Sequence, residues 1–375
     1  MAHNHLKGLN TLRFFAAILV LIDHGRHHLN EMNISFAERI SVFHQGKVAV
    51  DFFFVLSGFL ISYLALNEIK KTGKINYKFF YVRRILRIMP LYYLVLFLSL
   101  FLIGFIVPIL LNEDRLGFPL IEGGLLFIFM LPNLVKPIWE STVGGINILW
   151  SIGVEEQFYL LFPLIMFCVG RVKRKILIAG ILFLSYYIFY WSIQYSVINV
   201  SDVLVKFIAT LKFHYMLIGI LFSLICHTFL NDGNKINLFQ KLIDNDFFQS
   251  IIFVLALVKI FIAPTITPIL NDVFTGLIFS MLVIVVSHRN KGKIFNFDFK
   301  LLSYLGLISY GIYLLHPLVS YFIRFIITKS NFVGEVVKLY PYTYVIALIL
   351  VTLLVANFSY RFFEIKFLNL KDRFR

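Results

Sequence analysis

Long apolar runs, separated by short polar stretches rich in lysine and arginine, recur from one end of the chain to the other. A helix that crosses a bilayer needs roughly 20 mainly apolar residues, because it must bridge about 30 Å of hydrocarbon. By this criterion the sequence predicts about ten membrane-spanning helices. They cover residues 10–25, 48–66, 90–111, 149–169, 176–196, 207–230, 249–264, 272–288, 301–323 and 342–360.

One further apolar run, residues 120–133, is short and is interrupted by glycine and proline. If it crossed the membrane, the basic clusters of the loop 67–87 and of residues 171–175 would lie on opposite sides. If it does not cross, about two-thirds of the 35 lysine and arginine residues share one side, which the positive-inside rule makes cytoplasmic. We therefore predict a re-entrant or interfacial segment at 120–133, packed against protein, and cytoplasmic chain termini.

The composition supports a membrane protein and argues against nucleic-acid binding, the function that a basic chain usually suggests. Of the 375 residues 59% are hydrophobic and 15% are charged, and the formal net charge is +15. In a soluble chain this charge would suggest nucleic-acid binding, but apolar runs of this length and number do not fit that class. No predicted loop is long enough for a soluble domain, so residues 1–375 are expected to form one all-α domain in the bilayer. Its two cysteines lie in apolar runs, so neither a disulfide framework nor a metal site is expected.

Ionisable residues inside predicted spans are the candidates for function, because a charge in the bilayer is costly. Arg13 and His24 are separated by nearly three helical turns, so they share one helix face about 16 Å apart. Asp23 points elsewhere but could pair across a helix interface. The alternative is that Arg13 extends to the cytoplasmic headgroups and His24 is a hydrogen-bonded packing residue.

A pair of arginines precedes the third predicted span. Arg84 and Arg87 are three residues apart and therefore neighbours on one helical face, a spacing that suits a phosphate-bearing ligand. The simpler interpretation is a positive anchor at the cytoplasmic end of a span, shaped by the kink expected at Pro90.

Two adjacent carboxylates begin the fourth predicted span. Glu155 and Glu156 diverge by about 100°, so at most one of them faces a site. Glu155 shares its face with Tyr159, one turn later. Alternatively, the acidic pair stabilises a helix N-terminus and has no other role.

Several other polar residues in apolar runs are candidates for support or substrate binding. Asp51 is expected near the outer end of its span, and the small residues around Ser57 would let helices approach closely. Tyr313 precedes a second intramembrane histidine, His316, by three positions. By contrast, we expect a set of other basic residues to be interfacial and without a chemical role: Lys212, His214, Lys259, Arg324 and Arg361.

Taken together, these residues resemble the acyltransferase family 3 proteins, bacterial multi-spanning enzymes that most often O-acetylate surface glycans. The resemblance extends over nearly the whole chain. Arg13 and His24 match the family's Arg/Lys-x10-His signature. Four other stretches are similar to family motifs in the same order: 52–60 (FFFVLSGFL), 84–90 (RILRIMP), 153–159 (GVEEQFY) and 309–317 (SYGIYLLHP).

Two departures from the family pattern qualify the resemblance. The family's serine in the fourth motif is Gly153 here, although Ser151 lies nearby. Many members also carry a carboxy-terminal esterase-like domain, and the chain resembles the stand-alone subtype that has none.

The resemblance implies transfer of an acyl group, most often acetyl, from cytoplasmic acetyl-CoA to a hydroxyl of a cell-surface or exported glycan. His24 would be the general base, because histidine titrates near neutral pH, or, as the alternative, would carry the acyl group itself. Arg84 and Arg87 would hold the cofactor's phosphates, Arg13 would guide the pantetheine arm or stabilise the oxyanion, and Glu155 would orient His24 or bind the sugar. The expected location is the bacterial inner membrane.

Two other classes of function stay open at this point. A glycolipid or polysaccharide transporter also uses intramembrane Arg, His and Glu, although the sequence lacks paired half-chains with matching interrupted helices. A glycan-binding sensory module would leave His24 without a chemical task. The acceptor is equally open, among lipopolysaccharide O-antigen, capsule, exopolysaccharide, peptidoglycan, a nodulation-type oligosaccharide and an antibiotic scaffold. So are the acyl group and the oligomeric state.

Overall fold

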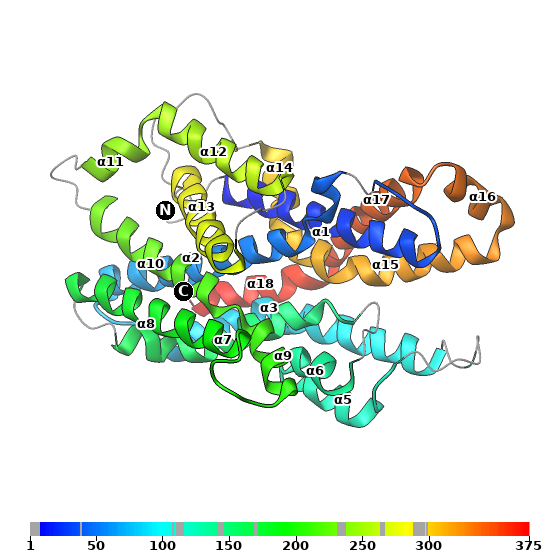
Figure 1. Ribbon diagram of the computed structural model, residues 1–375, viewed down its shortest axis with the longest axis horizontal. Coiled ribbons are helices and arrows are strands. Elements are labelled where there is room, and N and C mark those ends of the chain that lie inside the picture. Colours follow the sequence, from blue (N-terminus) through cyan, green and yellow to red (C-terminus); the bar gives the residue numbers. More distant parts are fainter. Residues whose placement is uncertain are drawn as a thin grey trace.

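The computed structural model is a bundle of helices that run mostly along its long axis (Figure 1). It describes residues 8–37, 40–106, 109, 116–140, 146–168, 172–230, 238–262, 267–287, 297 and 299–374. Over these residues there is no strand, as the all-α prediction requires.

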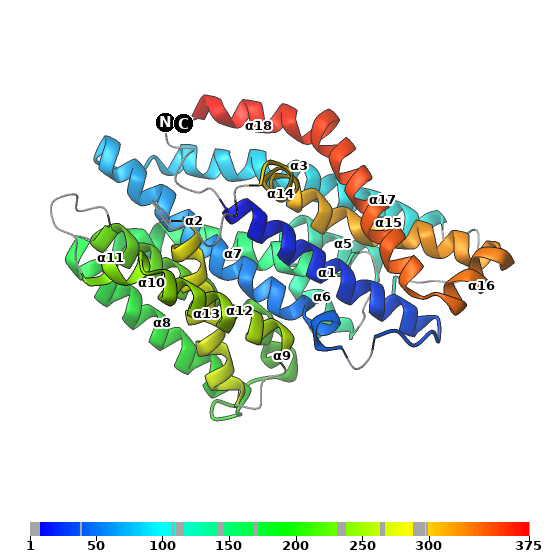
Figure 2. The ribbon, with the colours of Figure 1, turned by 90° about the horizontal axis from the view of Figure 1, so that it is seen from above.

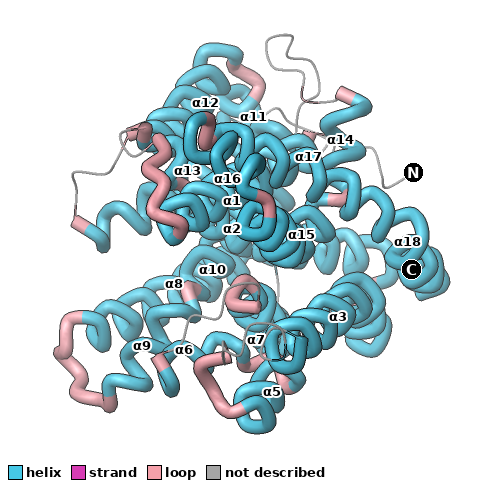
Figure 3. The backbone as a smooth tube through the Cα atoms, turned by 90° about the vertical axis from the view of Figure 1, so that its right-hand side faces the viewer, coloured by secondary structure: helices cyan, strands magenta, loops and turns pink. Residues whose placement is uncertain are grey.

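The first half of the chain supplies most of the helices that surround the polar interior. They are α1 (Leu9–Glu31), α2 (Gly46–Thr72), α3 (Tyr77–Phe101, continued by a π-helical turn Leu102–Ile106), α5 (Leu120–Ile128), α6 (Val135–Trp139), α7 (Leu149–Cys168) and α8 (Val172–Gln194). Short 3-10 turns occupy Ser41–His44 and Pro132–Leu134. Seen end-on, α1 and α2 lie near the centre (Figure 3).

The second half completes the bundle. Its helices are α9 (Asp202–Leu211), α10 (Phe213–Leu230), α11 (Leu238–Ile243), α12 (Asp246–Phe261), α13 (Pro268–Ser287), α14 (Lys300–Leu307), α15 (Ser309–Lys329), α16 (Asn331–Leu339), α17 (Tyr342–Ser359) and α18 (Ile365–Lys371). A π-helical turn, Tyr360–Glu364, joins α17 to α18, and Asp372–Phe374 form a last 3-10 turn. Viewed from above, α18 lies along the edge of the bundle beside α3 (Figure 2).

Seven helical stretches of the described chain are long and apolar enough to cross a membrane: Gly46–Thr72, Tyr77–Ile106, Arg174–Gln194, Asp202–Leu230, Pro268–Ser287, Ser309–Lys329 and Tyr342–Phe374. The other three predicted spans correspond to α1, α7 and α12. Charged residues interrupt the apolar sequence of α1 (Arg13, Asp23 and Arg26) and of α7 (Glu155 and Glu156), whereas α12 has only 16 residues. The chain is therefore a polytopic membrane protein.

Residues 120–133 do not form a spanning helix. At nine residues, α5 would cover only about 14 Å, less than half of the hydrocarbon thickness. Its chain then turns through Met130, whose φ is 60°, into the 3-10 turn Pro132–Leu134. The prediction of a short, non-crossing segment is confirmed.

Three boundaries differ from the sequence prediction. The segment 67–87 is not a loop, because α2 continues to Thr72 and α3 already begins at Tyr77. Lysine and arginine are good helix formers, so both helices extend beyond their apolar parts. The predicted span 301–323 is divided at Ile308 into α14 and α15, and the span 207–230 is divided at Lys212, whose φ is 35°.

Close backbone contact fixes α2 against α10. A Cβ atom on Gly58 would collide with the main-chain oxygen of Met216, and one on Gly219 would collide with that of Val55. Small residues at helix interfaces permit this approach in membranes. The close approach predicted for the region around Ser57 is therefore present, and it gives the polar interior a wall made of two tightly packed helices.

Candidate active site

A cavity of about 100 Å³ lies between α1, α2, α3, α7 and α15. Residues predicted from five separated motifs line it together. Its lining contains Arg13, Val50, Phe53, Phe54, Ser57, Leu60, Arg84, Arg87, Ile88, Ser151, Ile152, Glu155, Tyr159, Ser309, Tyr310 and Tyr313. We refer to this cavity as the arginine pocket.

Three guanidinium groups give the arginine pocket its positive charge. Arg13 comes from the first turns of α1, and Arg84 and Arg87 come from α3, where their spacing of three places them on one face. The guanidinium carbon of Arg84 lies 4.8 Å from the centre of the Tyr159 ring, within cation–π range. Among the described residues, no carboxylate lies within 4 Å of a nitrogen of these three arginines, so their charge is available to an anionic ligand.

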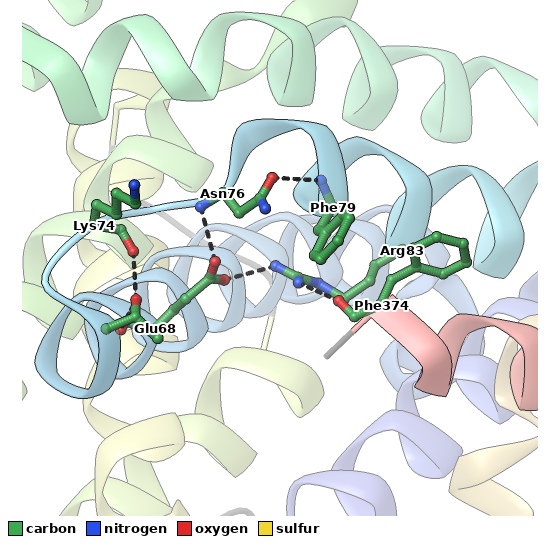
Figure 4. A network of polar contacts seen from close by, with 7 residues as sticks. Glu68, Lys74, Asn76, Phe79, Arg83 and Phe374 are labelled. Carbon is green, nitrogen blue, oxygen red and sulfur yellow. Dashed lines mark hydrogen bonds and ion pairs between the residues drawn. The ribbon is translucent and has the colours of Figure 1, made fainter.

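Arg83, the neighbour of Arg84, has a different environment (Figure 4). One of its guanidinium nitrogens donates to Glu68 at 2.7 Å and the other donates to the main-chain oxygen of Phe374 at 2.8 Å. Glu68 also accepts from the main-chain N–H of Asn76, which in turn caps α3 by accepting from Phe79. Arg83 therefore connects the end of α2, the beginning of α3 and the last 3-10 turn, outside the arginine pocket.

Of the two adjacent carboxylates, only Glu155 lines the arginine pocket, as their angular separation requires. Ser57 donates a hydrogen bond to its Oε1 at 2.8 Å, and Tyr159 donates to its Oε2 at 3.4 Å. Glu156 is buried on another face of α7, and its Oε1 has no hydrogen-bond partner among the described residues. The predicted Glu155–Tyr159 pair thus exists, joined by a serine from α2.

His24 is outside the lining of the arginine pocket and is connected to it through α15. Its Nδ1 lies 2.8 Å from Nε2 of His316, and the ring centres are 5.0 Å apart. Nδ1 of His316 lies 2.8 Å from the main-chain oxygen of Tyr313. Tyr313 itself lines the pocket, where its hydroxyl is 2.7 Å from Oγ of Ser151. The structure therefore brings the two intramembrane histidines into direct contact.

Asp23 and Asp51 do not reach the arginine pocket. Asp23 accepts a hydrogen bond from Arg26 at 3.1 Å, and Arg26 also donates to the main-chain oxygen of Phe43. Asp51 forms an ion pair of 2.6 Å with Lys212. We expected Lys212 to be interfacial and without a chemical role, whereas the break between α9 and α10 directs its ammonium group into the bundle, toward Asp51.

Around that ion pair lies a second polar cluster, which we define as Asp51, Lys212, Tyr215 and Asp272. Tyr215 donates a hydrogen bond to Asp272 at 2.9 Å. His214, also expected to be interfacial, is buried, and its Nε2 lies 3.6 Å from Asp272. Lys259 of α12 donates to Asn271 of α13, the residue before Asp272. This cluster lies between α2, α10 and α13, on a different face of α2 from the arginine pocket.

Two site residues escaped the sequence prediction. Tyr310 lines the arginine pocket and donates to the main-chain oxygen of Ile88 at 2.8 Å. Its spacing of three from Tyr313 was the available signal, because it places both tyrosines on one face. His28 lies one turn beyond His24 and is 2.7 Å from Oγ of Ser320, which is 2.8 Å from the Tyr344 hydroxyl. No group of three or more potential metal ligands occurs in the described part of the chain.

Comparison with known proteins identifies the family. A protein-family model described as an acyltransferase domain matches residues 6–360, nearly the whole chain. The chain belongs to the acyltransferase 3 family. O-acetyltransferase OatA of Staphylococcus aureus (strain NCTC 8325 / PS 47) is 29% identical to this acyltransferase chain over 96% of it. A second protein, from Staphylococcus aureus strain COL and provisionally named an O-acetyltransferase, is 26% identical over 97%.

This acyltransferase chain spans 57% of the length of each of these relatives. No solved structure matches the chain. In this structure, residues from the motifs that suggested the family meet in the arginine pocket and in the pair formed by His24 and His316 beside it, which we call the histidine pair.

The departure at Gly153 has a structural reason in this acyltransferase. A Cβ atom on Gly153 would lie 2.5 Å from Cδ of Pro132, so a serine there would collide with the turn that follows α5. Ser151, two residues earlier, lines the arginine pocket and contacts the Tyr313 hydroxyl. Ser151, two residues before this motif, thus supplies a hydroxyl to the pocket.

Proposed function

We propose that this chain transfers an acetyl group from acetyl-CoA to a hydroxyl of a cell-surface or exported glycan. The observation that carries the proposal is the convergence of Arg13, Arg84 and Arg87 in one cavity that connects, through Tyr313, to the histidine pair. Three cations that have no carboxylate partner in the described part of the chain suit the phosphates of a coenzyme A thioester. A histidine beside that cavity suits a proton transfer at neutral pH.

In the proposed reaction, His24 removes the proton of the acceptor hydroxyl as its oxygen attacks the thioester carbonyl. A carbon–oxygen bond forms, the carbon–sulfur bond breaks, and the proton passes from His24 to the leaving thiolate. Arg13 either guides the pantetheine arm or stabilises the oxyanion. Glu155, bonded to Ser57 and Tyr159, sits in the lining and is available to an acceptor hydroxyl.

The proposed orientation follows from the distribution of basic residues. With both termini in the cytoplasm of a bacterium, Arg84 and Arg87 near the start of α3 lie on the side where acetyl-CoA is made. Acceptor would approach from the outer side, toward the end of α1 that carries His24. Donor and acceptor then meet between the arginine pocket and His24.

Replacement of His24 tests the proposal most directly. We expect purified His24→Ala protein to consume no acetyl-CoA thioester, whereas wild-type protein does so in the presence of envelope glycans. Gel-filtration profile and thermal unfolding should match those of wild type, which excludes misfolding as the cause. Normal thioester consumption by the variant would remove His24 from the mechanism, and an inert wild-type protein that instead translocates a glycolipid would favour a transporter.

A further inference from the structure

A proline inside α15 leaves one main-chain oxygen without its usual donor. In an α-helix the N–H of residue i bonds the oxygen of residue i−4, but Pro317 has no N–H. The oxygen left over belongs to Tyr313. It is satisfied instead by the side chain of His316, whose Nδ1 lies 2.8 Å away.

This contact fixes the position of the hydrogen on His316. A carbonyl oxygen only accepts hydrogen bonds, so the hydrogen must be on Nδ1 of His316. A neutral imidazole has one N–H and one lone pair, which leaves the lone pair on Nε2. His316 is fully buried, an environment that disfavours a charged ring.

The tautomer of His316 determines the tautomer of His24. Because Nε2 of His316 is an acceptor, Nδ1 of His24 must donate the hydrogen bond of 2.8 Å that joins the two rings. The remaining lone pair of His24 is then on Nε2. His24 is only half-buried, whereas His316 behind it is inaccessible, so the free lone pair belongs to the ring that a substrate can reach.

Neither carboxylate expected near His24 performs this orientation. Asp23 accepts its hydrogen bond from Arg26, and Glu155 accepts from Ser57 and Tyr159. Histidine bases commonly have their second nitrogen held by a carboxylate or a main-chain carbonyl. Here a second histidine stands between the base and the carbonyl.

We propose that His316, held by the main-chain oxygen that Pro317 leaves free, fixes His24 in the tautomer whose lone pair is on Nε2. His316 is thus a positioning residue, and His24 removes the acceptor proton through Nε2. This inference rests on the proposed function for its catalytic consequence. The proton moves from the acceptor oxygen to Nε2 of His24 and then to the thiolate sulfur, and His316 keeps its own hydrogen throughout.

The tautomer is measurable without any activity. Histidine labelled with 15N distinguishes a protonated ring nitrogen from an unprotonated one, and a His24→Gln variant identifies the His24 signals. In the full-length wild-type protein at neutral pH, we expect Nδ1 to be protonated and Nε2 unprotonated in both His24 and His316. An Nε2-protonated His24 in the wild-type protein would overturn the inference.

Substitutions at position 316 separate positioning from packing. A His316→Phe variant keeps a ring but no acceptor, and we expect turnover of acetyl-CoA to fall about 10–100-fold, as for other partners that orient a functional histidine. His316→Gln places an amide oxygen where Nε2 was, so most of the turnover should return, with little change in KM for acetyl-CoA in either variant. Equal turnover in the two folded variants would contradict a positioning role.

Pro317→Ala provides a test that leaves both histidines intact. Alanine restores an N–H that competes for the Tyr313 oxygen, so His316 should exchange between tautomers and turnover should fall several-fold. Pro163→Ala, at an intrahelical proline of α7 that does not line the arginine pocket, is the matched control and should retain wild-type turnover. Unchanged 15N signals in Pro317→Ala would show that the proline does not set the tautomer.

These measurements keep the inference and the proposed function apart. If His24→Ala retains activity while the 15N signals are as expected, the proposed role of His24 fails and the hydrogen-bond assignment stands. If His24→Ala is inert and His316→Phe is fully active, His24 keeps its role and the positioning device is refuted.

Discussion

Two charged clusters lie on different faces of α2, and they differ in whether their cations have a carboxylate partner among the described residues. In the second polar cluster the ammonium of Lys212 meets the carboxylate of Asp51, and Asp272 accepts from Tyr215. In the arginine pocket three guanidinium groups accompany one carboxylate, Glu155, which is held by a serine and a tyrosine. In a buried ion pair each charge is neutralised by its partner, whereas cations without such a partner in a cavity can bind an anionic ligand. The contrast therefore separates charges that support the fold from charges available for binding.

The strongest test of this contrast removes charge from the arginine pocket. We expect Arg84→Gln and Arg87→Gln each to raise KM for acetyl-CoA about 10–100-fold, because each loses a charge-assisted contact of about 1.5–3 kcal/mol to phosphate. Turnover at saturation should change much less, since binding rather than the chemical step is affected. Steady-state kinetics measures both, and the thermal stability of the ligand-free protein should not fall, because no ion pair is broken. A fall in turnover at unchanged KM would contradict a role in donor binding.

The second polar cluster should respond in the opposite way. Lys212→Met leaves the Asp51 carboxylate without its partner, and we expect a loss of about 2–3 kcal/mol, somewhat less than for a fully buried pair because the Lys212 side chain is 24% exposed. Thermal or denaturant unfolding of the purified protein measures this loss. Adding Asp51→Leu to Lys212→Met should restore most of the stability, since the Asp51 carboxylate is then removed together with its partner. KM for acetyl-CoA should match wild type in the double variant, and an increase would mean that the second polar cluster also contributes to donor binding.

Arg83 offers the smallest expected effect and sharpens the contrast within one motif. Its guanidinium is engaged by Glu68 and by the main-chain oxygen of Phe374 outside the pocket (Figure 4). Arg83→Gln should therefore change KM for acetyl-CoA less than about twofold and cost about 1–2 kcal/mol of stability, because both partners of this ion pair are partly buried. The measurement is the same kinetic assay used for Arg84→Gln. Equal increases of KM in the two variants would indicate a general electrostatic effect of the basic motif.

Much of the arrangement was accessible from the sequence. Apolar run length located helices at all ten predicted spans, and the segment 120–133, predicted not to cross, holds a helix of only nine residues. Helical spacing placed Arg84 with Arg87, and Glu155 with Tyr159, on common faces. Each of these inferences depends on residues within one helix, where periodicity alone determines direction.

What the sequence could not supply was contact between helices. The serine that bonds Glu155 is 98 positions away in the chain, and the histidine that bonds His24 is 292 positions away. Lys212 appeared interfacial because its burial depends on a helix break and on an aspartate in another helix. His316 was visible as an intramembrane histidine, but its relation to His24 arises only where α1 and α15 meet.

The backbone contact between α2 and α10 has a mechanical consequence. Where a glycine on each helix lies against the main chain of the other, neither helix can slide or roll without an immediate collision. These two helices therefore form one rigid unit that keeps the arginine pocket and the second polar cluster at a constant distance from each other. Any widening of the cavity that admits a large, charged molecule must come from the other walls, where α3, α7 and α15 meet side chain to side chain.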